Sequence, residues 1–153
     1  MIVIADTNVF IDAIFHNDKD CMEILKREHK KELSFVMSNE MSEELLKTVF
    51  LHAIFLGCKL QDFQQPFSKI ARALRRTIPF EPSVKLYICK DPCDNMFLEC
   101  AVDYNVEYII SSDKDLLEIS GKIKTKNKQN INILSPYDFI NKHNLLKLKQ
   151  RFR

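Results

Sequence analysis

One short, uninterrupted apolar run and three short stretches dominated by apolar residues alternate with longer stretches in which apolar residues recur at helical spacing. Because strands buried on both faces carry such runs, we expect strands at residues 2–5, 33–37, 108–111 and 131–134. The helical spacing predicts helices beginning near residue 8, covering residues 19–30 and 61–76, and following Ser38 and the Asp91–Pro92 pair. Strands that alternate with helices predict an α/β fold: a doubly wound parallel sheet of four to five strands, with helices on both faces.

The segments between these elements are connections. Pro79 and Pro82 interrupt the pattern, so we expect a short strand or extended piece before Val84. Residues 113–119 are expected to turn into a short helix, residues 122–130 to form a loop-like insert, and Ser135 to cap a last helix. At 153 residues the chain suits one domain, and we expect it over residues 1–142, followed by a basic C-terminal tail over residues 143–153.

Composition excludes several classes of protein. Two glycines are too few for a phosphate-binding loop or a dinucleotide fingerprint, which need several close together. Five cysteines without a C-x-x-C pair indicate a reduced, cytosolic protein, and the four scattered histidines argue against a zinc site at Cys89 and Cys93. No apolar run reaches the ~18 residues of a membrane span, and we see no signal peptide, so we expect a cytoplasmic protein without a membrane partner.

Acidic residues stand at equivalent places relative to the expected strands. Asp6 comes directly after the first strand, and Asp113 follows the third apolar run. Glu44 lies two turns into the helix after the second strand, and Asp94 lies in the first turn of the helix opened by Asp91–Pro92. Because ligands of doubly wound sheets bind beyond the carboxyl ends of the strands, we expect these four carboxylates to converge on one cleft.

Four neighbouring carboxylates repel one another, which raises their pKa values unless cations lie between them. Hard divalent ions such as Mg²⁺ and Mn²⁺ prefer oxygen ligands, so the cluster predicts a metal site suited to phosphoryl transfer. Each acid taken alone also has a plainer interpretation. Asp94 and Asp113 could be helix caps, and Glu44, like its neighbours Glu40 and Glu43, could be a surface charge. The prediction therefore depends on four positions agreeing.

Basic residues cluster in three places, although the formal net charge is only +2. One cluster lies in the expected 61–76 helix, one in the 122–130 insert and one in the tail. Such clusters can follow a phosphate backbone when an acidic centre lies between them, although each cluster alone is more typical of a solvated surface. The residues that we expect to bind nucleic acid are Arg72, Arg75, Arg76, Lys122, Lys124 and Lys126.

Four motifs, in order and at suitable spacings, resemble those of the PIN-domain nucleases. They are ADTN at residues 5–8, SNEMSEEL at 38–45, DPCDNMFLECA at 91–101 and IISSDKDLL at 109–117. The resemblance extends over almost the whole chain and is closest to the VapC-like toxins of toxin–antitoxin pairs. It implies a parallel sheet with helices on both sides and a metal-dependent endoribonuclease site.

The resemblance also assigns roles to residues of this chain. It implies that the catalytic and metal-binding acids are Asp6, Glu44, Asp94 and Asp113. It selects Glu44 over Glu43 because the family's glutamate lies six residues beyond the serine that here is Ser38. Asn39 and Ser112 depart from the family's frequent proline and glycine, and neither change removes a carboxylate. The resemblance implies supporting roles for Asn8 and Ser112, which would orient carboxylates or the attacking water, and for Asp115, which would assist as an outer ligand.

These observations predict an endoribonuclease that depends on Mg²⁺ or Mn²⁺ and cleaves single-stranded RNA, as the toxin of a toxin–antitoxin pair with an antitoxin protein as its partner. One alternative is a catalytically inert PIN-like module that binds RNA or protein. Another is a receiver-like domain that accepts a phosphoryl group, but such domains carry an acidic pair after the first strand, where Asp6 stands alone. A haloacid-type phosphatase would need a second aspartate where Asn8 stands.

The stretch from residue 50 to residue 67 is rich in large apolar side chains. Core packing is the favoured interpretation, and a homodimer face is the alternative. The side chains concerned are Phe50, Leu51, Ile54, Phe55, Leu56, Phe63 and Phe67.

Overall fold

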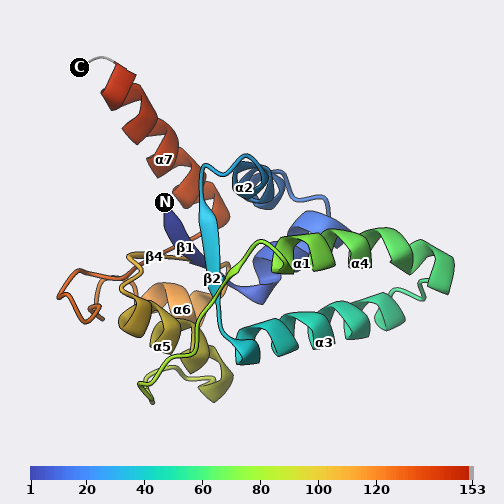
Figure 1. Ribbon diagram of the computed structural model, residues 1–153, viewed down its shortest axis with the longest axis horizontal. Helices are drawn as coiled ribbons and strands as arrows, with labels where there is room; N and C mark the ends of the chain where they lie inside the picture. Colours follow the sequence, from blue (N-terminus) through green and yellow to red (C-terminus); the bar gives the residue numbers. More distant parts are fainter. Residues whose placement is uncertain (152–153) are drawn as a thin grey trace.

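In the computed structural model, the backbone is described for residues 1–151 and the side chains for residues 1–59 and 61–144. Over this range five strands form one sheet: β1 (Ile2–Ala5), β2 (Ser34–Met37), β3 (Ile78–Pro79), β4 (Tyr108–Ile110) and β5 (Asn132–Leu134). All neighbouring strands pair in parallel, in the order β3-β2-β1-β4-β5 (Figure 1). The predicted doubly wound parallel sheet is confirmed.

Helices cover both faces of this sheet (Figure 1). Between β1 and β3 the chain forms α1 (Thr7–Phe15), α2 (Lys19–His29), α3 (Asn39–Phe55) and α4 (Leu60–Leu74). After β3 come the 3₁₀ turn η1 (Pro92–Asp94), α5 (Asn95–Tyr104), α6 (Lys114–Glu118) and α7 (Pro136–Arg151). Because parallel crossovers are right-handed, α1 to α4 lie on one face and α5 and α6 on the other. Helix α7 packs against α2, and the α3–α4 pair projects beyond the sheet.

The core forms around the central strands. Val3, Ile4, Ile109 and Ile110 are fully buried, as expected for strands covered on both faces. Phe10 of α1 packs edge-on against Phe35 of β2, with ring centroids 5.3 Å apart. Burying each such side chain contributes about 1.5–3 kcal/mol, so the ends of β1 and β4 are held firmly in place.

Side-chain caps fix the helix starts that the sequence indicates. The Ser38 hydroxyl accepts the Met41 amide at 3.2 Å, which opens α3. The Ser135 hydroxyl accepts the Asp138 amide at 3.1 Å, at the start of α7. Asp91 accepts from the amide two residues ahead and opens η1, so the helix expected after Asp91–Pro92 begins as a 3₁₀ turn before α5.

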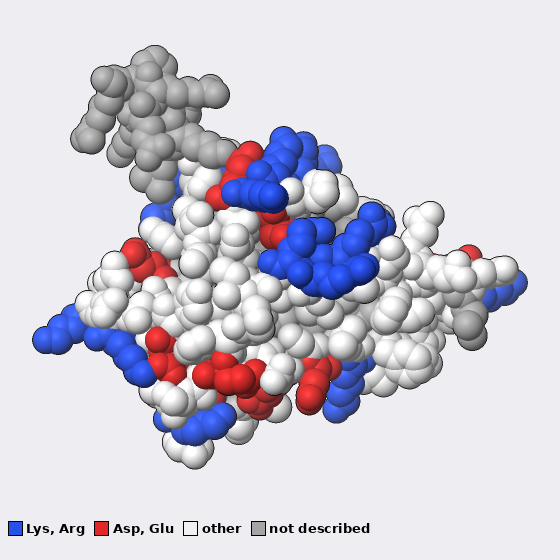
Figure 2. Space-filling view, in the orientation of Figure 1, with Lys and Arg blue, Asp and Glu red and all other residues white. Residues whose placement is uncertain are grey.

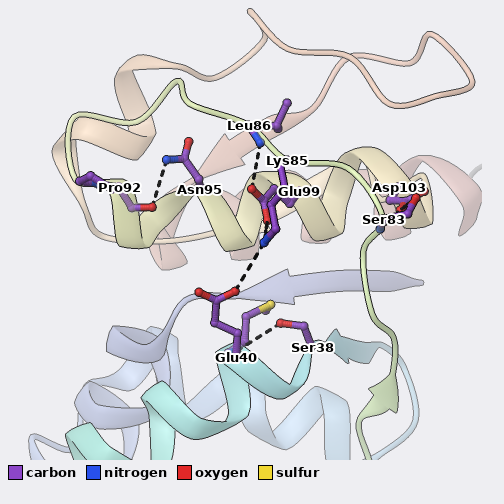
Figure 3. Close-up of polar contacts among 10 residues, drawn as sticks. Ser38, Glu40, Ser83, Lys85, Leu86, Pro92, Asn95, Glu99 and Asp103 are labelled. Carbon is purple, nitrogen blue, oxygen red and sulfur yellow. Dashed lines mark hydrogen bonds and ion pairs between the residues drawn. The ribbon is translucent and has the colours of Figure 1, made fainter.

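The segment of residues 80–91, which we call the strap, lies along α5 (Figure 3). Three α5 side chains spaced four residues apart hold it: Asn95, Glu99 and Asp103. The buried Glu99 carboxylate accepts the Leu86 amide at 2.9 Å and the Lys85 Nζ at 3.0 Å. Asn95 and Asp103 accept backbone amides on either side of that point. The strap therefore reaches η1 in a fixed position beside the end of the sheet.

The favoured interpretation of the apolar stretch as core is wrong for most of its side chains. Phe63 is partly buried against the core, but the other six are between 47% and 87% exposed. The reason is architectural, because the α3–α4 pair projects beyond the sheet (Figure 1). The exposed six are Phe50, Leu51, Ile54, Phe55, Leu56 and Phe67.

The remaining expectations concern the insert, the tail and the cysteines. Residues 122–130 form a loop closed by an antiparallel bridge between Lys124 and Asn130, with the Thr125 side chain buried. The predicted boundary between residues 142 and 143 falls inside α7, and the tail side chains from residue 145 onward lie outside those described. All five cysteines are free. In the described part of the chain, no helix has the length and apolar character needed to cross a membrane.

Candidate active site

The site lies where β1 and β4 end side by side. Ala5 pairs with Ile110, so Asp6 and Ser111 leave the sheet at the same level. The connections from β1 and β4 depart toward opposite sides, and this is where doubly wound sheets bind ligands. We call this side of the sheet the carboxyl edge and the opposite side the amino edge.

Asp6 is a buried carboxylate at the start of α1. Its Oδ1 accepts the Asn8 amide at 3.4 Å, and its Oδ2 accepts the Ser111 hydroxyl at 2.6 Å. Burial raises the pKa of Asp6 above its ordinary value, the Ser111 hydrogen bond opposes this rise, and the charge of Asp113 adds to it. A buried carboxylate that is only partly compensated by donors is suited to receive a cation.

Ser111 joins Asp6 to Asp113. While its hydroxyl donates to Asp6, its oxygen accepts the Asp113 amide at 2.9 Å. Asp113 in turn caps α6, because its Oδ1 accepts the amides of Asp115 and Leu116 at 2.7 and 3.0 Å. Asp113 is therefore the N-cap of α6, as the plainer interpretation of this residue predicts. Both of these hydrogen bonds go to Oδ1 and not to Oδ2.

Glu44 reaches the site from α3. Its Oε2 accepts the buried Thr7 hydroxyl at 2.7 Å, which connects α3 to the first turn of α1. Burial raises the pKa of Glu44, and the charges of Asp6 and Asp91 raise it further. Glu43, by contrast, is exposed. Local geometry thus distinguishes Glu44 from its neighbour, in agreement with the choice implied by the resemblance.

Asp94 ends η1 and faces the other acids. Burial raises its pKa to about 7, together with the negative charges of Asp6, Asp113, Asp91 and Glu44. The negative charges of four other carboxylates therefore act on the Asp94 carboxyl group. Three of the acids predicted from the sequence, Asp6, Glu44 and Asp113, thus act electrostatically on the fourth, and Asp91 adds its charge to theirs.

The donor set fits a hard divalent cation. The polar atoms that converge here are carboxylate oxygens, the ligands of Mg²⁺ and Mn²⁺. Among the described residues, no group of three or more His, Cys, Asp or Glu side chains is arranged so that it could hold a metal ion. The charges of Asp6 and Glu44 add to the rise in the pKa of Asp94, and the charge of Asp113 adds to the rise in the pKa of Asp6.

The predicted supporting residues differ in their surroundings. Asn8 Nδ2 lies 3.5 Å from Asp6 Oδ2. Asp115 accepts the Lys90 Nζ at 2.6 Å and so belongs to an ion pair between α6 and the strap. Ser112 is exposed, and the neighbouring Ser111 makes the contact with Asp6.

Sequence reasoning missed two residues, Thr7 and Ser111, which hold Glu44 and Asp6. Both stand inside the motifs that carry the acids. Their position is the signal that could have found them, because each is a hydroxyl residue within two positions of the end of a strand that leads into the site.

The predicted nucleic-acid residues lie toward the amino edge, away from the carboxylates. Arg76 comes just before β3 and holds the buried Glu28, with Nη2 to Oε2 at 2.6 Å. The Lys126 side chain pairs with Asp103 at the C-terminal end of α5, and the Lys126 backbone amide donates a hydrogen bond to the Val102 carbonyl. In Figure 2 most acidic side chains gather along the lower side, with some basic ones beside them, and the largest basic group covers α2 and α4.

A hollow of about 390 Å³ underlies this basic group. It lies between α1, α2 and α4, with an apolar lining that includes Ile14 and Leu25. Its basic lining residues are Lys26, Lys69, Arg72 and Arg76. This hollow of mixed apolar and basic character therefore does not coincide with the carboxylates.

Comparison with known proteins assigns the fold and the family. A family model described as PIN domain matches residues 2–115, which is most of the chain. The chain therefore belongs to the PIN domain family. Among solved structures, a chain of VapBC2 from Rickettsia felis, bound to a DNA fragment from their promoter, has the same fold with a TM-score of 0.55. It is 18% identical, and the match covers 88% of this chain and 98% of that one. No curated protein matches the sequence.

Proposed function

We propose that the chain is a divalent-metal-dependent endoribonuclease that cleaves single-stranded RNA as the toxin of a toxin–antitoxin pair. The observation that carries the proposal is the placement of Asp6, Asp113 and Glu44 at the carboxyl edge by Ser111 and Thr7, where their charges act on Asp94. Membership of the PIN domain family supports a nuclease over a receiver-like phosphoacceptor. The likeness of fold to the VapBC2 chain supports the toxin assignment and an antitoxin partner.

The chain's own residues have distinct roles in this proposal. Asp6, Asp94 and Asp113 would hold Mg²⁺ or Mn²⁺. When bound, such an ion lowers the pKa of a water molecule and neutralises negative charge at the phosphate. Glu44, oriented by Thr7, holds or orients the attacking water. Burial of Asp6 and its bond to Ser111 fix one carboxylate precisely enough to position the others around it.

RNA binding is proposed to use two separate parts of the surface. The scissile phosphate lies at the carboxyl edge, and the backbone continues toward the amino edge, where Arg72, Arg75 and the 122–130 lysines contribute phosphate contacts. Contacts of this kind make binding fall steeply with salt while leaving the cleavage step at the carboxylates unchanged. The free cysteines support a reducing compartment, and we propose the cytoplasm.

The decisive experiment is cleavage of a mixed single-stranded RNA with Mg²⁺, with Mn²⁺ and with EDTA. Wild type is compared with Asp6→Asn, Glu44→Gln and the matched control Glu43→Gln. We expect divalent-dependent cleavage that falls by 10²-fold or more in the first two variants, because each loses a group at the reacting phosphate. The control variant should retain wild-type activity, since Glu43 is exposed.

Full activity of Asp6→Asn would overturn the assignment of the site. The inert binding module is the alternative, and it predicts RNA binding by wild type with no cleavage in either ion. A small protein that binds the chain and suppresses its cleavage of RNA would establish the proposed antitoxin pairing.

A further inference from the structure

Two histidines meet on the surface at a distance from the carboxylates. His16 ends α1 and His52 lies in the last turn of α3, and their Nε2 atoms are 3.2 Å apart. Along α3, His52 lies eight residues beyond Glu44, or about 12 Å at 1.5 Å per residue. Both side chains are at least partly accessible to solvent. This pair has no part in the proposed cleavage of RNA.

The separation of the two nitrogens suits a shared transition metal. A tetrahedral zinc ion with Zn–N bonds of about 2.0–2.1 Å holds two ligand nitrogens about 3.3–3.4 Å apart. The observed Nε2–Nε2 separation of 3.2 Å is close to that span, so little movement is needed. Without a metal, one Nε2 donates a hydrogen bond to the other. Metal binding requires both imidazoles to be neutral with their Nε2 lone pairs free, so each carries its proton on Nδ1.

The surroundings of His16 favour a proton on its Nδ1. Its Nδ1 lies 2.8 Å from Oδ1 of Asp12, one turn earlier on α1. A carboxylate accepts only, so it places the His16 proton on Nδ1 and leaves Nε2 free to bind a metal. A carboxylate behind a histidine in this way fixes the ring's orientation and raises its basicity as a ligand.

Packing also restrains the rings. The His52 ring lies between Phe15 and His16, with both centroids 5.0 Å away and both contacts edge-on. After His16 the chain turns sharply, because Asn17 has a φ of 54° and the Asp18 amide bonds the Asp12 carbonyl at 3.0 Å. The two imidazoles are therefore held by neighbouring groups before any ligand arrives.

We propose that His16 and His52 form a binding site for a borderline transition-metal cation, Zn²⁺ in the first instance, with Asp12 as the positioning residue. Among the described residues no third His, Cys, Asp or Glu completes the set, so water fills the other positions. Imidazole nitrogen selects Zn²⁺, Ni²⁺ or Cu²⁺ over Mg²⁺, which separates this site chemically from the carboxylates. A bound ion links the C-terminal ends of α1 and α3, whose other ends carry Thr7 and Glu44.

The test is equilibrium dialysis against Zn²⁺ in excess Mg²⁺, which occupies the oxygen ligands. Wild type is compared with His16→Gln, His52→Gln and the matched control His29→Gln, an exposed histidine on α2. We expect the first two variants to bind one equivalent of zinc fewer than wild type and the control. Zn²⁺ should raise the thermal midpoint of wild type and the control more than that of the two variants, because a ligand that binds only the folded state stabilises it.

Asp12→Asn provides a second readout that a merely structural role would not move. It should keep the wild-type stoichiometry but weaken zinc binding by about 10- to 100-fold, as loss of a carboxylate behind a ligating histidine does. Equal zinc binding in wild type, His16→Gln and His52→Gln would overturn the site. Unchanged affinity in Asp12→Asn would remove the positioning role.

Discussion

At the residue scale, the hydroxyl of Ser111 links two acids of the candidate site. Ser111 donates to Asp6 and accepts from the Asp113 amide, so one buried side chain fixes two acids. The sequence places two serines in succession before Asp113, and only their direction in the structure separates them. Side chains at the end of a strand alternate in direction, which explains why Ser112 is exposed while Ser111 is buried.

The serine pair gives a matched test. Ser111→Ala removes a donor from a buried carboxylate, so the pKa of Asp6 should rise further and the affinity for Mg²⁺ or Mn²⁺ should fall. We expect a loss of about 10- to 100-fold in metal affinity or activity, the usual effect of removing a partner of a ligating group. Ser112→Ala should be close to wild type. Measuring metal-dependent RNA cleavage in both variants checks this, and equal losses would contradict the role of Ser111.

Asp94 supports a prediction about pH. Its pKa of about 7 in the folded chain is above the ordinary value of 3.8, so the folded state holds this proton more tightly than the unfolded state does. The free energy of unfolding should therefore fall as pH rises from about 4 to about 7, by on the order of 1 kcal/mol once solvent screening is allowed for. Urea unfolding in EDTA at pH 4 and pH 8 measures this difference.

Asp94→Asn should reduce that dependence and be more stable than wild type at pH 8. Asp62→Asn, at an exposed position in the first turn of α4, serves as the control and should keep the wild-type dependence. Identical dependence in wild type and Asp94→Asn would show that the acids do not converge on this residue.

At the scale of elements, most of the sheet and its helices follow from local patterns. The run at residues 2–5 gives β1 with the same bounds, and the Ser38 and Ser135 caps lie where turn chemistry places them. The partners of the acids could not be predicted in this way. Thr7 meets Glu44 across 37 residues of sequence and Ser111 meets Asp6 across 105, so only the packed sheet brings them together.

The strap is the element whose attachment is most open to test. Glu99→Ala removes the acceptor for the Leu86 amide and the partner of Lys85, leaving a buried amide without its bond. We expect a loss of about 1–3 kcal/mol in the free energy of unfolding and faster hydrogen exchange at the strap amides. Removing the exposed Glu118, which also pairs with a strap lysine, should cost only about 0–1 kcal/mol. Similar losses in Glu99→Ala and Glu118→Ala would contradict the anchoring role of Glu99.

At the scale of the whole molecule, charge and apolar surface are divided among three regions. The acids occupy the carboxyl edge, basic groups lie over α2 and α4, and exposed apolar side chains gather on the α3–α4 pair (Figures 1 and 2). Sequence patterns predicted the side of the sheet for the acids, but not the side of the molecule for the basic and apolar residues. The prediction that the apolar side chains of residues 50–67 lie in the core is wrong for most of them, because helical spacing shows that a helix face is apolar without showing what packs against it.

An exposed apolar cluster on a projecting helix pair is a surface suited to a second copy of the chain, and we predict a homodimer through it. Phe55 is 87% exposed and Ile54 60% exposed, so burying them against a partner removes apolar area from water. Sedimentation at several concentrations should show a mass that rises toward the dimer for wild type, while Phe55→Ser and Ile54→Ser remain monomeric. Tyr137→Ser, at a 63% exposed position on α7, should behave as wild type. A wild-type protein that stays monomeric at every concentration would remove the dimer and leave the cluster to another partner.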